Sequence, residues 1–191
     1  YGASMGTTAQ SYTTTTTGMF SYLTAYGLRD ITDGSSNTIT FGEHLVGAAQ
    51  VLKGLRGLSW WPCGGGAAPT GYYDASNSNG AYLNDLATCN SNYASGTNLH
   101  NDIGNNWLLG GFGMIRTIVP PNSTLYLWGE CNPSCSAGEP MYSNATSNHS
   151  GGCNFLFGDG SVKFIKSSIG QNIYFALGTR ALGEVVSGDA F

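Results

Sequence analysis

The sequence predicts an α+β fold built mainly from antiparallel β-structure. Three patterns carry this prediction: a β-hairpin over residues 148–165, a short strand over residues 38–43, and a helix over residues 168–177. The chain has 191 residues, a length that suits one domain with one main core.

The hairpin pattern is the strongest of the three. Asp159-Gly160 lies between two apolar-rich runs, and Asp-Gly favours a type I′ turn because both turn residues need positive φ. This turn pairs Phe157 with Val162, and a strand period of two then predicts which side chains share a face. The predicted apolar face holds Phe155, Phe157, Val162 and Phe164. The predicted opposite face holds Asn154, Leu156, Lys163 and Ile165.

The helix over residues 168–177 has Ser167 or Ser168 as N-cap and Gly178 as stop, although alternating apolar residues leave a strand as the alternative. The branched side chains of residues 13–17 predict a strand that continues through residues 18–23. The remaining strands are predicted at residues 114–119, 125–130 and 184–186.

The chain divides into a β core and an insertion. Residues 1–43 and 148–191 carry the core patterns, whereas residues 44–147 are rich in aromatic residues, Gly and Asn. We therefore expect a single domain, 1–191, in which residues 44–147 form a long, loop-rich insertion. Its Tyr and Trp side chains would give a large contact area at low entropic cost.

The composition points to self-association. Only 9% of the residues are charged, compared with about 25% in ordinary globular domains. A weakly charged surface does little to keep copies apart, so copies of the chain itself are the expected partner. Seven basic residues and a net charge of −4 argue against nucleic-acid binding. No apolar run is long enough to predict a membrane span.

Five cysteines leave one without a partner in the chain. Cys131 and Cys135 are close enough in sequence to close a small loop, which leaves Cys63 to pair with Cys89. Cys153 is expected as a free, buried thiol on the apolar hairpin face. The spacing does not provide a second close pair of ligands for zinc.

Three ordered motifs carry a resemblance to a known family. They are His149 followed after nine residues by Asp159-Gly160, the segment 30–43 (DITDGSSNTITFGE), and the segment 177–186 (LGTRALGEVV). Together they resemble the pilin-like, or pseudopilin-like, H-X9-DG domain family of planctomycetes and their relatives. The resemblance implies a pilin-like globular head and a structural role for His149, Asp159, Gly160, Asp33, Gly34, Asn37 and Glu43. It also implies a prepilin leader and a long apolar helix, neither of which occurs in these residues.

The motif residues also have chemical interpretations. A catalytic pair of His149 and Asp159 is disfavoured, because six extended residues span roughly 20 Å and place the two at opposite ends of a strand. An oxygen-rich group matches the ligand preference of Ca²⁺, but its spacing fits a hydrogen-bonded turn better. That group is Asp30, Thr32, Asp33, Ser35 and Asn37. We expect no cofactor.

Several positions are candidates for glycosylation in a secreted protein. The N-x-S/T sites are Asn122, Asn144 and Asn148. The candidates for O-glycosylation are Thr13, Thr14, Thr15, Thr16 and Thr17.

We expect a structural subunit of an extracellular or cell-surface filament, without enzymatic activity. The alternatives are a surface-glycan-binding or secretion-associated pseudopilin-like module and, less favoured, a polysaccharide hydrolase. Hydrolysis would need two nearby carboxylates, and the available candidates are Glu43, Glu130 and Glu139. No catalytic motif connects any two of them.

Overall fold

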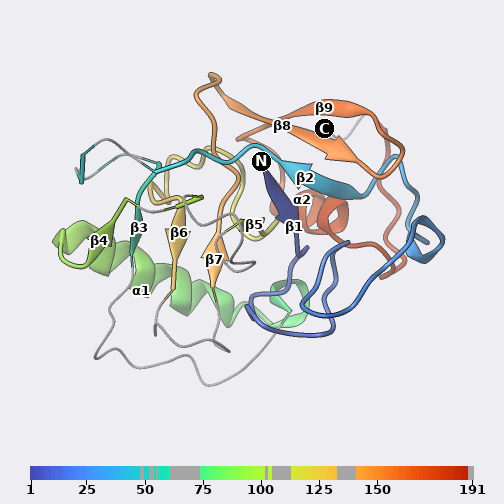
Figure 1. The fold of residues 1–191 in the computed structure, drawn as a ribbon, viewed down its shortest axis with the longest axis horizontal. Helices are drawn as coiled ribbons and strands as arrows, with labels where there is room; N and C mark the ends of the chain where they lie inside the picture. The colour runs from blue at the N-terminus through green and yellow to red at the C-terminus, as the bar shows by residue number, and fades with distance from the viewer. Residues whose placement is uncertain are drawn as a thin grey trace.

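The computed structural model describes residues 1–47, 50, 51, 54, 56–60, 74–101, 103, 104, 113–132 and 141–188. Within these residues the chain forms two β-sheets and two α-helices, one helix in contact with each sheet (Figure 1). This arrangement confirms the prediction of an α+β fold with mainly antiparallel strands.

The first sheet has five strands in the order β5-β1-β2-β8-β9. They are β1 (Gly2–Ser4), β2 (Ile39–Gly42), β5 (Met114–Ile115), β8 (Gly152–Phe157) and β9 (Val162–Lys166). Neighbouring strands are antiparallel except β1 and β5. Helix α2 (Gln171–Gly178) lies against this sheet, and its Tyr174 and Leu177 form an apolar cluster with Cys153 and Phe155.

The second sheet has four short strands in the order β4-β3-β6-β7. They are β3 (Ser59–Trp60), β4 (Leu99–His100), β6 (Glu130–Cys131) and β7 (Tyr142–Ser143). Helix α1 (Tyr82–Ser95), green in Figure 1, runs across these strands. Its Leu86, Cys89 and Tyr93 pack with Trp128 in a second buried cluster.

Residues 44–147 therefore contain more regular structure than the loop-rich insertion we expected. All of α1 and the second sheet lie there, together with β5 of the first sheet. The spacing of the buried Leu86, Cys89 and Tyr93 is three and four residues, as a helix face requires. The Asn and Ser residues between them have low helix propensity, which hides the pattern.

The hairpin forms, but its predicted register is wrong by one residue. Leu156 lies opposite Val162, and Phe155 lies opposite Lys163. The connection consists of residues 158–160, in which Gly160 alone has positive φ (85°), so the turn is not type I′. On β9 the faces are consequently exchanged: Ile165 is buried, whereas Val162 is 65% and Phe164 41% exposed.

Tertiary contacts explain this register. The Gly158 N–H donates to the Thr38 carbonyl at 2.9 Å, and the Asp159 N–H donates to the Ser35 carbonyl at 3.1 Å. A Cβ atom at Gly158 would lie 2.7 Å from the end of the Ile31 side chain and 3.1 Å from the Ser35 carbonyl oxygen, so glycine eases this close approach. The turn is thus positioned by residues distant in sequence, which a local turn rule does not include.

Within the described residues two further strand predictions are wrong, and two are confirmed only in part. Residues 13–17 are irregular, because Thr hydroxyls bond the main chain instead; Thr16 Oγ1, for example, donates to the Phe20 carbonyl at 2.7 Å. Residues 18–23 contribute only a bridge from Phe20 to Ala25, and residues 184–186 form no strand. Of the strand predicted at 114–119 only the start forms, as β5, and of that predicted at 125–130 only the end, where β6 begins. These two strands belong to different sheets.

Two element predictions are confirmed. Strand β2 ends at Gly42, immediately before Glu43, as the alternating pattern indicated. The segment after the hairpin is the helix α2 rather than a strand, although it begins one residue after Gly170, which replaces the predicted serine cap.

Candidate functional site

The partner of His149 is Glu43, at the end of β2. His149 lies in the turn before β8, and its Nε2 is 3.1 Å from Glu43 Oε1. Asn154, on β8, donates its main-chain N–H to Glu43 Oε2 at 2.8 Å and its side-chain amide to Oε1 at 3.1 Å. The upstream motif and the hairpin motif therefore meet at one carboxylate.

The electrostatics keep Glu43 ionised. Burial raises the pKa of its carboxyl, but the hydrogen bonds from Asn154, the nearby His149 and Ser147 outweigh burial and hold the pKa below its ordinary value. Glu43 thus acts as a hydrogen-bond acceptor that joins β2 to β8.

Asp159 has a separate task in the hairpin turn. Its Oδ1 accepts from the Ser161 N–H at 2.9 Å and from the Ser161 hydroxyl at 2.7 Å. Both bonds lower the pKa of Asp159, and the bond from the Ser161 hydroxyl has the larger effect. His149 and Asp159 contact different partners at opposite ends of β8, so their arrangement gives no catalytic pair.

Asn122 is a central residue that sequence reasoning considered only as a glycosylation site. Its side chain is buried and accepts from the Ser147 N–H at 2.9 Å. Its amide donates to the carbonyls of His149 at 3.0 Å and Gly152 at 2.8 Å. Asn122 therefore fixes the turn that places His149 beside Glu43. Asn122 has a φ of 51°, a conformation that Asn adopts more readily than most residues, so an Asn directly after Pro120-Pro121 was the signal that the sequence offered.

The upstream motif also joins the C-terminal motif. The Asp33 carboxylate accepts from the N–H groups of Leu182 at 2.9 Å and Gly183 at 2.8 Å. The Asn37 N–H donates to the Gly34 carbonyl at 2.9 Å and closes the turn, in which Gly34 has a φ of 98°. Asp33 thus joins the upstream motif to the C-terminal motif, while Gly34 and Asn37 close the turn that follows it.

Arg180 in the C-terminal motif extends this connection. Its Nη1 donates to the carbonyls of Thr16 and Gly18, the latter at 2.6 Å. Its guanidinium lies 3.5 Å from the centre of the Tyr26 ring, a cation–π distance. This side chain organises an N-terminal segment that has little regular structure.

The oxygen-rich group proposed for Ca²⁺ serves the turn. Asp30 accepts from the Gly27 N–H at 2.7 Å, and Asp33 is occupied by Leu182 and Gly183. Among the residues that the structure describes, no three His, Cys, Asp or Glu side chains are grouped as metal ligands. The carboxylates that a cation would need are directed at main-chain N–H groups.

Two adjoining hollows open beside Glu43. The first, of about 280 Å³, is lined by Tyr1, Glu43, His44, Leu45, Thr146, Ser147, Asn148 and His149. The second, of about 390 Å³, is mainly apolar and is lined by Tyr1, Phe41, Glu43, Asn154, Phe155, Leu156 and Val162. Of the described residues lining them, Glu43 is the single carboxylate. Glu130 is fully buried elsewhere, and Glu139 lies outside the described residues.

Access differs among the glycosylation candidates. Asn148 is exposed, whereas Asn122 and Asn144 are buried, and Asn144 donates to the Trp128 carbonyl at 2.9 Å. Only Asn148 of the three is open to a transferase in the folded chain. In the threonine run, Thr14 and Thr15 are exposed and Thr16 is buried.

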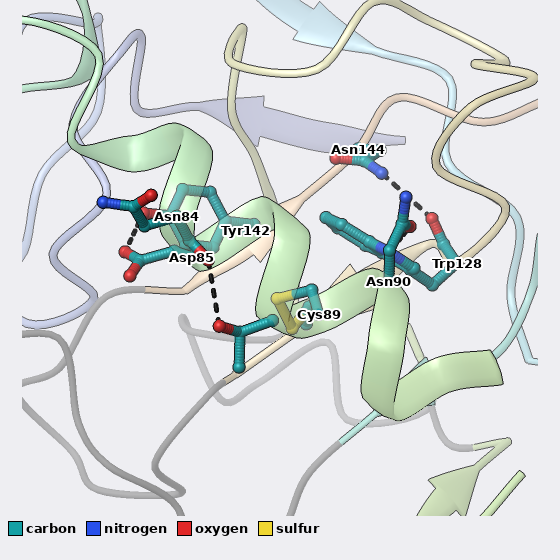
Figure 2. Close-up of a disulfide and its surroundings, with 9 residues drawn as sticks. Asn84, Asp85, Cys89, Asn90, Trp128, Tyr142 and Asn144 are labelled. Atoms are coloured by element: carbon teal, nitrogen blue, oxygen red, sulfur yellow. Dashed lines mark hydrogen bonds between the residues drawn. A yellow bond between two sulfur atoms is a disulfide. The ribbon is translucent and has the colours of Figure 1, made fainter. Parts of the chain in front are cut away.

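The disulfide pairing differs from our expectation. Cys89 of α1 is bonded to Cys131 of β6, with 6.0 Å between the Cα atoms (Figure 2). This bond excludes both predicted pairs, Cys131 with Cys135 and Cys63 with Cys89. The prediction favoured partners close in sequence, because α1 and its packing on the second sheet were missed. Cys63 and Cys135 lie outside the described residues. Cys153 is free and buried, as predicted.

Polar contacts flank this disulfide on both sides. Asp85 of α1 accepts from the Tyr142 hydroxyl at 2.5 Å, and Asn90 of α1 accepts from the Trp128 indole N–H at 3.0 Å; Figure 2 labels these residues around the disulfide. Helix α1 is therefore attached to the second sheet, and to the segment just before β6, by a covalent bond and by hydrogen bonds.

No helix within the described part of the chain has the length and apolar character needed to cross a membrane.

The comparisons with known proteins identify a family. None of the curated proteins and none of the solved structures matches the chain. The model of the family SBP_bac_10, described as "Protein of unknown function (DUF1559)", matches residues 1–172. This match includes the middle of the chain, where the sequence motifs gave no resemblance. Since it covers most of the 191 residues, the chain belongs to this family, which is the pilin-like H-X9-DG type.

Proposed function

We propose that this protein is a structural subunit of an extracellular filament or surface assembly that is built from copies of the chain. One observation carries the proposal: an apolar row crosses the face of the first sheet opposite α2. Phe41, Leu156 and Val162 lie side by side on β2, β8 and β9. Phe164 follows on the next outward position of β9.

This face is only partly covered by the chain itself. The Phe20 ring packs on Phe41 at 4.9 Å between centroids, and His149 lies 6.5 Å from the Phe164 ring. Val162 and Phe164 remain exposed, and the apolar hollow beside Leu156 is open. Contiguous apolar surface of this kind is typical of protein–protein contacts.

Few charges oppose contact between copies. Arg116 is fully buried and donates to the Thr8 carbonyl at 3.1 Å and the Ser143 hydroxyl at 3.0 Å. Burial lowers the pKa of Arg116 to about 10, although Glu130 and Tyr142 act in the opposite direction. Lys163 bonds the Ser36 carbonyl at 2.8 Å. Internal bonding of this kind further reduces the charge available at a surface that has little of it.

The motif residues support an architectural role without catalysis. Glu43, Asp33 and Asp159 each accept hydrogen bonds from main-chain N–H groups. Such contacts position strands and turns. The disulfide between Cys89 and Cys131 is compatible with secretion, since disulfides persist in oxidising compartments.

The test is the assembly state of the purified chain. Sedimentation velocity and negative-stain electron microscopy should show concentration-dependent particles larger than one chain. Val162→Glu should reduce this association, because it places a charge in the apolar row, whereas Val185→Glu, at a residue that is 98% exposed, should not. Dispersed single chains at every concentration would refute the proposal.

A second function is favoured by the hollow beside Glu43. It joins a carboxylate, the exposed imidazole of His149 and the exposed amide of Asn148 near the Tyr1 ring, a set of groups suited to a sugar. This supports the alternative of a surface-glycan-binding or pseudopilin-like module. Binding on a glycan array that is lost in His149→Ala would favour it over a purely structural role.

A further inference from the structure

Among the strands that the structure describes, β9 lies at one edge of the first sheet. Two hydrogen bonds define which of its main-chain groups face outward. The Phe157 N–H donates to the Ser161 carbonyl at 2.9 Å, and the Ser167 N–H donates to the Gly151 carbonyl at 2.7 Å. Hydrogen-bonded pairs alternate along an antiparallel ladder, so Lys163 and Ile165 bond β8. The N–H and C=O groups of Val162 and Phe164 therefore point away from the sheet.

The side chains along this edge make it attractive for pairing. Val162 and Phe164 are exposed and lie on the apolar outer face. Lysines often protect edge strands, and β9 contains two. Lys163, however, is folded back, with its Nζ on the Ser36 carbonyl and 4.5 Å from the centre of the Phe157 ring. Lys166 lies at the end of the strand and is exposed.

Charges of opposite sign occupy the two ends of the edge. Asp159 is fully exposed in the turn before β9, and Lys166 ends the strand. An antiparallel copy reverses this order, so each end of the edge meets the opposite charge on the copy. The edge is therefore complementary to itself, as a two-fold interface requires.

We propose that β9 pairs antiparallel with β9 of a second copy, about a two-fold axis at Lys163. This inference rests on the proposed function and specifies one of its contacts. Val162 lies opposite Phe164 of the copy, and the two exchange main-chain hydrogen bonds. Lys166 then lies opposite Gly160 of the copy, next to Asp159.

The register follows from the charges. On β9 only Val162, Phe164 and Lys166 direct their main-chain N–H and C=O groups outward. The possible registers therefore shift the pairing by two residues at a time, which moves the two-fold axis by one residue. An axis at Phe164 would place Lys166 opposite Val162, away from Asp159. An axis at Val162 would carry Lys166 past the turn, to Gly158. Of these three positions, only the axis at Lys163 brings Lys166 of each copy beside Asp159 of the other. It also joins the apolar rows of the two copies into one continuous face.

Cysteine cross-linking tests this geometry. In the proposed pair, residue 163 faces itself at a non-hydrogen-bonded position, where Cβ atoms lie about 4.5–5.5 Å apart and a disulfide needs little adjustment. Lys163→Cys should therefore form a disulfide-linked dimer under mild oxidation. The matched control is Lys166→Cys, whose two copies would lie roughly 20 Å apart and should not link.

A backbone substitution provides an independent test. Phe164→Pro removes an outward N–H while leaving the bonds to β8 intact, so it should weaken dimer formation about tenfold relative to Phe164→Ala, which keeps the N–H. Equal cross-linking of the two cysteine variants, or none in either while the wild type assembles, would overturn the inference and leave the proposed function standing. A wild-type chain that never associates would remove both.

Discussion

Single polar side chains fix the geometry of the motif region. Asn122, Glu43 and Asp33 each accept hydrogen bonds from main-chain N–H groups of segments distant in sequence. Their residue types were visible in the sequence, and Glu43 and Asp33 were identified as structural residues from the resemblance. Their partners were not predictable, because each bond depends on how the segments are arranged in space.

Asn122→Ala should lower the free energy of unfolding by about 2–3 kcal/mol, because it leaves the buried Ser147 N–H without its acceptor and removes one of the two donors to the Gly152 carbonyl. Urea denaturation measures this change. Asn148→Ala, at an exposed position in the same turn, should change stability by less than about 0.5 kcal/mol. Equal effects of the two substitutions would contradict the role assigned to Asn122.

Glu43 should make stability depend on acid pH. Its pKa in the folded chain lies below the ordinary value of 4.5, so the stability that it contributes is present above pH 4.5. This contribution should be lost as the pH falls below 4.5 and through the lowered pKa. Melting temperatures of the wild type and Glu43→Gln should therefore differ most at neutral pH and converge in acid. A constant difference at all pH values would show that the charge of Glu43 does not matter.

At the level of elements, long-range contacts determine the hairpin register and the disulfide pairing, which the sequence patterns did not predict. The hairpin was predictable from Asp159-Gly160, but its register was not, because Thr38 and Ser35 hold the turn. Helix α1 was signalled only by the spacing of Leu86, Cys89 and Tyr93 within polar sequence. Once α1 was missed, the partner of Cys89 could not be predicted either.

Breaking the bond between Cys89 and Cys131 should destabilise the second sheet and α1. The two residues are 42 positions apart, and the entropy of closing such a loop corresponds to about 4 kcal/mol. The variant with Cys89→Ala and Cys131→Ala should melt at a lower temperature than Cys153→Ala, which removes a free thiol. Peptide mapping of the unreduced chain should recover Cys89 linked to Cys131. A link between Cys63 and Cys89 would contradict the structure.

Across the whole molecule, the first and last quarters of the chain are joined to each other, and the middle contributes a strand to the first sheet. Arg180 and Asp33 connect the first and last quarters, which explains why motifs so far apart in sequence occur together. The fold class followed from strand and helix patterns. The second sheet did not, because its strands contain only two residues each and show no alternation.

Arg180→Ala should loosen the N-terminal segment while leaving the hairpin intact. The substitution removes hydrogen bonds to the carbonyls of Thr16 and Gly18 and the contact with the Tyr26 ring. Amide hydrogen exchange over residues 13–27 should accelerate about tenfold, while exchange in β8 stays unchanged. Arg29→Ala, whose side chain is 93% exposed, is the control. Unchanged exchange near Thr16 would show that other contacts order this segment.

The thiol of Cys153 has a practical consequence. Burial raises its pKa to about 12, and the side chain is sealed between β8 and α2. A thiol that is neither ionised nor accessible does not react with alkylating reagents. Alkylation of this sulfur therefore requires β8 and α2 to separate. The rate at which Cys153 is labelled in the native protein thus reports how often these two elements open.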